Sequence, residues 1–337
     1  MSHRNDHVAS QTREPDAIRV AAGADRTTTA VERPARDPEG PTRAASKDAT
    51  VAVLLGLLAG LLGLVPWLVT GARLPLLNLW GSQVWPGQMP LALLPLSQYE
   101  STTLVALMTT GGAAAGLAVR CWPSPRRRLV MWCAAGGVLA VQVTATIQAF
   151  TVVGGGLAAG PRSILYVGGL LAGVVAAMVA GMVALLLLAA KSRALAALGV
   201  GVMAVPFVSW AAAGVTHLAG VGGVSPLVSM LWRCLPAVLV GVALAWCGLR
   251  PAVRALVWLV DLAMLWVVPA MFTAVRSVLG TRVLGGDLQE MTAMGKQVFM
   301  GALGPAGGTG PTILLALAIA LVGTFVRAAA LNQWRAR

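Results

Sequence analysis

The feature that most constrains this chain is a series of long apolar stretches that recurs along most of its length. A helix needs about 20 mostly apolar residues to cross a bilayer, because all its backbone hydrogen bonds must be made within the segment. We therefore predict an all-α fold, a polytopic integral membrane bundle of about eight transmembrane helices. The eight predicted spans cover residues 50–70, 101–119, 129–152, 163–190, 194–218, 227–249, 255–275 and 312–326.

Composition and charge exclude two broad classes of function. Only 11% of the 337 residues are charged, against about a quarter in soluble domains, which excludes a soluble enzyme. The net charge of +13 does not form a basic binding surface, because residues 1–50 hold eight basic and eight acidic residues. The other 17 basic residues fall mainly in short connections between apolar stretches. We expect the lipid bilayer as the main partner and no nucleic acid.

The distribution of basic residues predicts an orientation. With the amino terminus inside, the cytoplasmic connections carry eleven basic residues and the outward ones five. Basic residues concentrate on the cytoplasmic side of membrane proteins. We therefore expect a multi-pass protein of the plasma (inner) membrane with both termini in the cytoplasm. The 22 arginines against 3 lysines, with abundant Ala, Gly and Val, point to a GC-rich genome and a bacterial source.

The chain divides into tails and a bundle. Residues 1–49 are polar, rich in Pro, Thr, Arg and Asp, and contain no aromatic residue. Such a segment cannot bury enough apolar surface to offset its ordering entropy. We predict a disordered cytoplasmic tail over 1–49, a transmembrane bundle over 50–330 and a short basic cytoplasmic tail over 331–337.

Short similarities occur in the same order in residues 50–190 and 194–330. Each match is weak, and chance similarity in a sequence rich in Ala, Leu, Val and Gly is the alternative explanation. Their shared order favours two parallel halves of four helices, and transporters with parallel repeats bind substrate between the halves. The matches pair Val65-Pro-Trp with Val205-Pro-Phe, Leu117-Ala-Val-Arg-Cys-Trp with Leu244-Ala-Trp-Cys, Phe150-Thr-Val-Val with Phe272-Thr-Ala-Val, and Gly160-Pro-Arg with Gly310-Pro-Thr.

Two outward connections differ from ordinary loops. Residues 71–100 are rich in proline and apolar side chains with only two charges, so we expect a segment packed on the bundle. Residues 286–303 predict a short helix with an apolar stripe of Leu288, Met291, Met294 and Phe299. Both connections are expected to cover any site on the outer side.

Small residues at intervals of four predict where helices approach closely. The chain contains Gly56-xxx-Gly60, Gly112-xxx-Gly116 and Gly169-xxx-Gly173-xxx-Ala177-xxx-Gly181. We expect all three series to lie at tight contacts between helices.

Asp261 is the acidic residue placed deepest in a predicted span, seven residues beyond Arg254, or about 10 Å into the membrane. An ionisable group at mid-membrane costs about 2.5–3.5 kcal/mol on insertion scales and is therefore a functional candidate. Asp261 fits a coupling carboxylate for a proton or cation. The alternative is a structural Asp that bonds a neighbouring helix or pairs with a basic residue.

Further candidates for a substrate or ion pathway are polar residues of other spans. Arg233, Glu100 and His217 fall at a similar outward level, where Arg233 either anchors an anionic substrate or extends its side chain to the interface. Gln142 opens a polar stretch, residues 142–148, that either lines a pathway or forms hydrogen bonds between helices.

Catalytic and cofactor motifs are absent from the sequence. It contains no G-x-x-x-x-G-K-[ST], H-E-x-x-H or G-x-S-x-G pattern, and its four cysteines form no C-x-x-C. We expect no enzymatic activity, no cofactor and no metal site.

Two functions are favoured, and a membrane-embedded transferase is the third possibility. The leading hypothesis is a small-solute or lipid-type transporter or permease subunit. The alternative is a non-catalytic membrane scaffold or accessory subunit that contacts a membrane-protein partner or a second copy of itself. A transporter should contain a cavity between its two halves, whereas a scaffold should be packed throughout.

Overall fold

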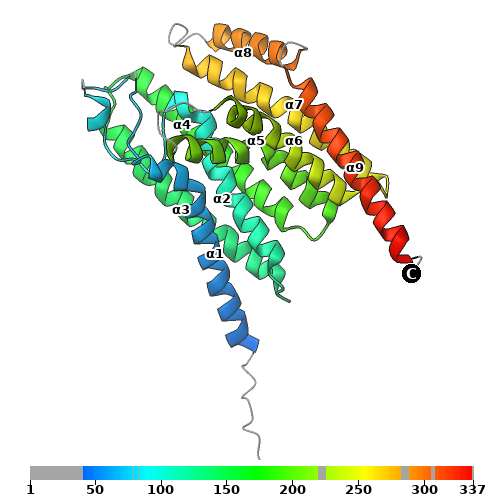
Figure 1. The fold of residues 1–337 in the computed structure, drawn as a ribbon. Coiled ribbons are helices and arrows are strands. Elements are labelled where there is room, and N and C mark those ends of the chain that lie inside the picture. The colour runs from blue at the N-terminus through cyan, green and yellow to red at the C-terminus, as the bar shows by residue number, and fades with distance from the viewer. Residues whose placement is uncertain are drawn as a thin grey trace, which may run out of the picture. The chain divides into compact units, whose positions relative to one another are not determined.

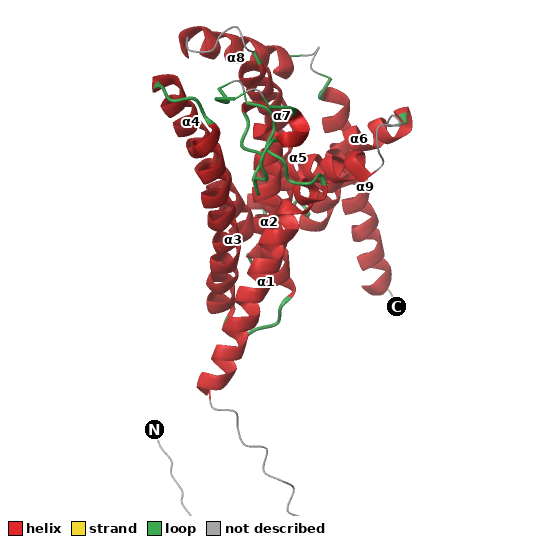
Figure 2. Cartoon of the chain, turned by 90° about the vertical axis from the view of Figure 1, so that its left-hand side faces the viewer, coloured by secondary structure: helices red, strands yellow, loops and turns green. Residues whose placement is uncertain are grey.

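The computed structural model describes residues 41–77, 79–82, 84–218, 225–281, 288–304 and 308–335. These residues form helices and loops without any strand (Figures 1 and 2). Residues 1–40 of the predicted tail, which spans 1–49, lie outside the described part. The helices are α1 (Pro41–Val69), η1 (Pro86–Gln88), η2 (Gln98–Glu100), α2 (Ser101–Cys121), α3 (Arg127–Gly156), α4 (Pro161–Ala189), α5 (Arg193–Leu218), α6 (Pro226–Cys247), α7 (Val253–Gly280), α8 (Leu288–Leu303) and α9 (Gly310–Arg335).

Every α-helix except α8 is long and apolar enough to cross a membrane. The eight apolar helices predicted from the sequence are therefore confirmed, as is the short helix before the last of them. The two ends of the bundle differ most from the prediction. Helix α1 begins at Pro41 and so includes residues 41–49 of the predicted tail, and α9 continues to Arg335, beyond residue 326.

Proline and glycine account for several helix ends. Helices α4 and α6 begin with Pro161 and Pro226, where the missing N–H of proline leaves no hydrogen bond unmade. Helix α6 ends before Gly248, whose φ of +74° suits glycine. The N–H of Gly248 donates to the carbonyl of Leu244 at 2.9 Å, which closes the helix.

Arginines satisfy the last carbonyl groups of two helices. Arg120 and Arg127 donate to the end of α4. Arg254 donates to the carbonyl of Cys247 at 3.0 Å, and Arg327 donates to that of Trp246 at 2.6 Å, both at the end of α6. Terminal carbonyls lack partners within the helix and attract cations. These four arginines thus provide hydrogen bonds to carbonyl groups at the ends of α4 and α6.

Close contacts at glycines join α1 to α3 and α2 to α4. A Cβ atom added to Gly56 would lie 2.1 Å from the carbonyl oxygen of Ala134, and one added to Gly112 would lie 2.1 Å from that of Gly181. Gly116 meets Leu185 in the same way, at 2.6 Å. Close approach at the first two glycine series is confirmed, because only a hydrogen atom fits between these backbones.

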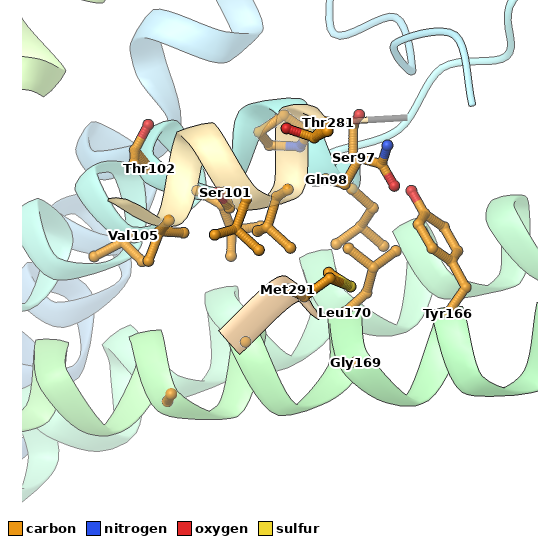
Figure 3. A pocket seen from close by; sticks show the side chains of 18 of the residues that line it. Ser97, Gln98, Ser101, Thr102, Val105, Tyr166, Gly169, Leu170, Thr281 and Met291 are labelled. Atoms are coloured by element: carbon orange, nitrogen blue, oxygen red, sulfur yellow. The ribbon is translucent and has the colours of Figure 1, made fainter. Parts of the chain in front are cut away.

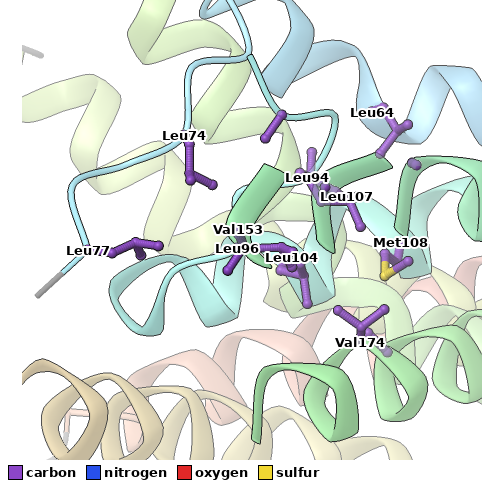
Figure 4. Close-up of a cluster of buried hydrophobic side chains, with 14 of the residues drawn as sticks. Leu64, Leu74, Leu77, Leu94, Leu96, Leu104, Leu107, Met108, Val153 and Val174 are labelled. Atoms are coloured by element: carbon purple, nitrogen blue, oxygen red, sulfur yellow. The ribbon is translucent and has the colours of Figure 1, made fainter. Parts of the chain in front are cut away.

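The connection between α1 and α2 packs on the bundle as predicted. Its residues Leu74, Met89, Leu94 and Leu96 are 0–1% exposed and join the main hydrophobic cluster (Figure 4). The side-chain amide of Gln148 on α3 accepts from the N–H of residue 93 and donates to the carbonyl of residue 91. These hydrogen bonds join the connection to α3, in addition to the backbone hydrogen bonds that pair its residues 72–74 with 90–92.

We predict that Gly112→Ala lowers the free energy of unfolding by about 1–3 kcal/mol, because the added methyl group overlaps the backbone of α4. The measurement is a titration with sodium dodecyl sulfate in mixed micelles. Gly136→Ala is the matched control, since a Cβ there meets nothing within 4 Å. Equal stability of the two variants would contradict the close packing of α2 and α4.

Candidate functional site

A cavity of about 700 Å³ lies at the end of the bundle where α2 and α4 begin and α7 ends. One wall is the first turns of α2 together with residues 95–98 of the preceding connection. Residues 162–176 of α4 and 271–279 of α7 form the other walls, and Met291 of α8 also lines the cavity (Figure 3). We call this cavity the α4–α7 pocket.

The α4–α7 pocket is open between the two helices that give it its name. Leu165 on α4 and Met271 on α7 both line it, yet they remain 66% and 46% exposed. Both helices are apolar enough to cross a membrane. In a membrane crossed by these helices, this opening would face the lipid chains, and a molecule could reach the pocket sideways.

The walls are mainly apolar, and polar groups gather at one end. Figure 3 shows the side chain of Tyr166 on α4 directed toward Gln98 and Ser97. The hydroxyl of Ser101 is buried without a hydrogen-bond partner among the described residues. Arg162 is exposed and is the only charged residue among the described residues that line the pocket. The arrangement suits an amphipathic ligand with a long apolar part and a small polar part.

Glycines of α4 create part of the open volume. Gly169 and Gly173 line the pocket, and a Cβ atom added at either would meet nothing within 4 Å. The prediction of close packing along the whole glycine series of α4 is therefore wrong for these two positions. Only the later members contact α2: Ala177 is 1% exposed, and a Cβ on Gly181 would lie 3.0 Å from the carbonyl oxygen of Met108.

A second hollow of about 520 Å³ lies between α7 and α8. It shares Met271, Val275 and Val278 with the α4–α7 pocket. Phe299 of the predicted apolar stripe lines it from α8. One apolar face of α7 thus borders both hollows.

Asp261 lies deep in the bundle, away from the pocket. Its side chain is 0% exposed, and neither carboxylate oxygen has a hydrogen-bond partner among the described residues. It presses on α5, where a Cβ atom on Gly201 would be 2.1 Å from Oδ1. The indole N–H of Trp258, one turn earlier, is also buried without a described partner. A charge without a partner is costly in such surroundings.

Gln142 forms a hydrogen bond between helices. It is 2% exposed, and its Nε2 donates to the carbonyl of Met108 on α2 at 2.9 Å. Its Oε1 has no partner within the described residues. Gln142 does not line the α4–α7 pocket.

The structure gives Arg233 and Glu100 different neighbours. Arg233 on α6 is exposed, and its Nη2 lies 3.7 Å from a Cβ placed on Gly308, just ahead of α9. Glu100 ends η2, which packs on α2 and α7. His217 belongs to the last turn of α5, and its side chain lies outside the described part. The two described side chains of the predicted outward site are therefore not brought together.

No residue that lines the pocket was among the substrate or ion-pathway candidates predicted from the sequence, although two sequence features lie at the pocket. The small residues of α4 indicate either a contact or a cavity, and only the direction they face decides which. The apolar stripe predicted within residues 286–303 indicates a helix that covers an apolar surface. Arg162 stands in the sequence as an outward basic residue that follows Gly160-Pro.

Comparison with family models, curated proteins and solved structures gives no match for this chain.

We predict that Gly201→Ala lowers the free energy of unfolding by about 1–3 kcal/mol, because its methyl group would overlap the Asp261 carboxylate. The double variant Gly201→Ala/Asp261→Ala should recover most of this loss. Gly214→Ala is the control on the same helix, since its added Cβ meets only ordinary contacts from 3.7 Å. The same titration in mixed micelles measures these three variants and Asp261→Ala alone. An additive double variant would refute the direct contact.

Proposed function

We propose that this multi-spanning protein is a lipid-type transporter that takes an amphipathic molecule from one leaflet of the membrane. The observation that supports this most strongly is the α4–α7 pocket, which is apolar, open at the side and polar at one end. Ligand pockets of proteins commonly enclose about 300–1,000 Å³, so its volume suits part of a small molecule or a lipid chain. The open side leaves room for the remainder in the bilayer.

A small polar solute fits this pocket less well. Such a solute needs several converging polar groups and access from water, whereas long stretches of these walls are Leu, Val, Met and Gly. Asp261 and Gln142 are buried and do not line it. The lipid-type form of the transport hypothesis is therefore the one we retain.

We further propose that the bundle consists of two parallel halves, α1–α4 and α5–α7 with α9. The pattern of helix packing supports this. In the first half α1 packs on α2 and α3, and α2 packs on α4. In the second half α5 packs on α6 and α7, and α6 packs on α9. The pocket would then lie between α2 and α4 of one half and α7 of the other, where transporters built from repeats bind substrate.

In the proposed orientation both termini lie in the cytoplasm of a plasma-membrane protein. The pocket then opens to the outer leaflet, because α2 and α4 begin on that side. Helix α7 carries both Asp261 and the pocket residue Met271, about 15 Å apart along a helix. We propose Asp261 as the coupling carboxylate, since a change in its charge would disturb the contact of α7 with α5.

The test uses full-length protein in vesicles that contain phospholipids labelled with a nitrobenzoxadiazole group on one chain. Dithionite added outside destroys only the fluorescence of the outer leaflet. We predict that vesicles with the protein lose more than the outer-leaflet fraction, for phosphatidylglycerol or phosphatidylcholine probes. Gly169→Phe should abolish the extra loss, because the phenyl ring fills the pocket.

Gly168→Phe is the matched control. Gly168 has equally open space around its Cβ position but does not line the pocket, so this variant should retain the movement of wild type. Equal losses with and without protein for both probes would refute lipid movement. Equal activity of the two phenylalanine variants would refute the role of the pocket.

A further inference from the structure

We infer that the ligand of the α4–α7 pocket is a lipid with an anionic headgroup, which Arg162 binds at the polar end while an acyl chain occupies the apolar part. This inference rests on the proposed function and specifies its substrate class. The α4–α7 pocket, the charge of Arg162 and the groups around Arg162 support it.

Charge selects the headgroup. Arg162 is the only charged residue among the described residues lining the pocket, and it lies in the first turn of α4. A guanidinium offers planar, paired donors that match phosphate and carboxylate oxygens. Glu100 adjoins Ser101 in the chain but does not line the cavity, so the described lining offers no carboxylate for a cationic headgroup.

One helix start reinforces the preference for an anion. Helix α4 begins at this end of the pocket, and its N-cap residue Gly160 provides no side-chain cap. Backbone N–H groups at a helix start carry a partial positive charge and bind anions. The hydroxyl of Ser101, which has no hydrogen-bond partner among the described residues, is available to donate to the same headgroup.

The apolar part is shaped for a chain. From the level of Tyr166, Gly169 and Gly173 of α4 leave open space opposite Met271 and Val275 of α7. Neither glycine position places a side chain in the way. A chain can thus lie along α4 with its headgroup at Arg162, and the opening between the helices lets a second chain remain in the bilayer.

The experiment measures binding of chain-labelled phosphatidylglycerol and phosphatidylcholine with identical chains to the full-length protein in detergent micelles. Wild type should bind phosphatidylglycerol about tenfold more tightly than phosphatidylcholine, as expected for one charge-assisted contact. Arg162→Gln should reduce this preference to within about twofold, and Arg162→Lys should keep most of it. Equal binding of the two lipids by wild type would overturn the inference without any variant.

Arg276→Gln is the charge-matched control, because Arg276 is exposed near the end of α7 and does not line the pocket. It should keep the wild-type preference, and a loss as large as that of Arg162→Gln would overturn the assignment to Arg162. Gly169→Phe separates this inference from the proposed function. If Gly169→Phe prevents binding of both lipids while Arg162→Gln keeps the preference, the pocket stands and the role of Arg162 fails. If Gly169→Phe binds like wild type, the pocket itself is refuted.

Discussion

The contact between α2 and α4 sets the geometry on which the pocket depends. At Gly112 and Gly116 the two backbones touch with no side chain between them. Gly181 of α4 still lies against Met108 of α2. About one turn nearer the start of each helix, Ala176 of α4 and Val105 of α2 line the cavity. The contact therefore holds one end of α4 in place while the other end borders open volume. Rigid packing beside a cavity gives a binding site of defined shape.

Polar groups inside the bundle serve different purposes according to whether they find partners. Gln148 and Gln142 make hydrogen bonds to backbone groups of other segments, and these stabilise the arrangement of the chain. Asp261 finds no such partner and packs against a glycine. Buried groups that lack partners require an explanation other than stability, and this contrast is why Asp261 remains the candidate for coupling.

Hydropathy alone predicted the eight apolar helices, since span length and internal backbone hydrogen bonding leave few alternatives. It also predicted that Asp261 lies inside the bundle and that residues 286–303 contain a short helix. It did not locate the pocket, because the glycines of α4 look identical in sequence whether they face α2 or empty space. Nor did similar depth bring Arg233 and Glu100 together, because depth does not specify on which side of the bundle a helix lies.

With the proposed function, the sideways opening between α4 and α7 would determine which ligand concentration matters. A molecule that arrived through this opening would be supplied by the surrounding leaflet, and its availability would be a mole fraction among lipids. Diluting vesicles in buffer would leave the occupancy unchanged, whereas adding other lipids would lower it. The protein would thus respond to the lipid composition of the leaflet rather than to the volume of water around it.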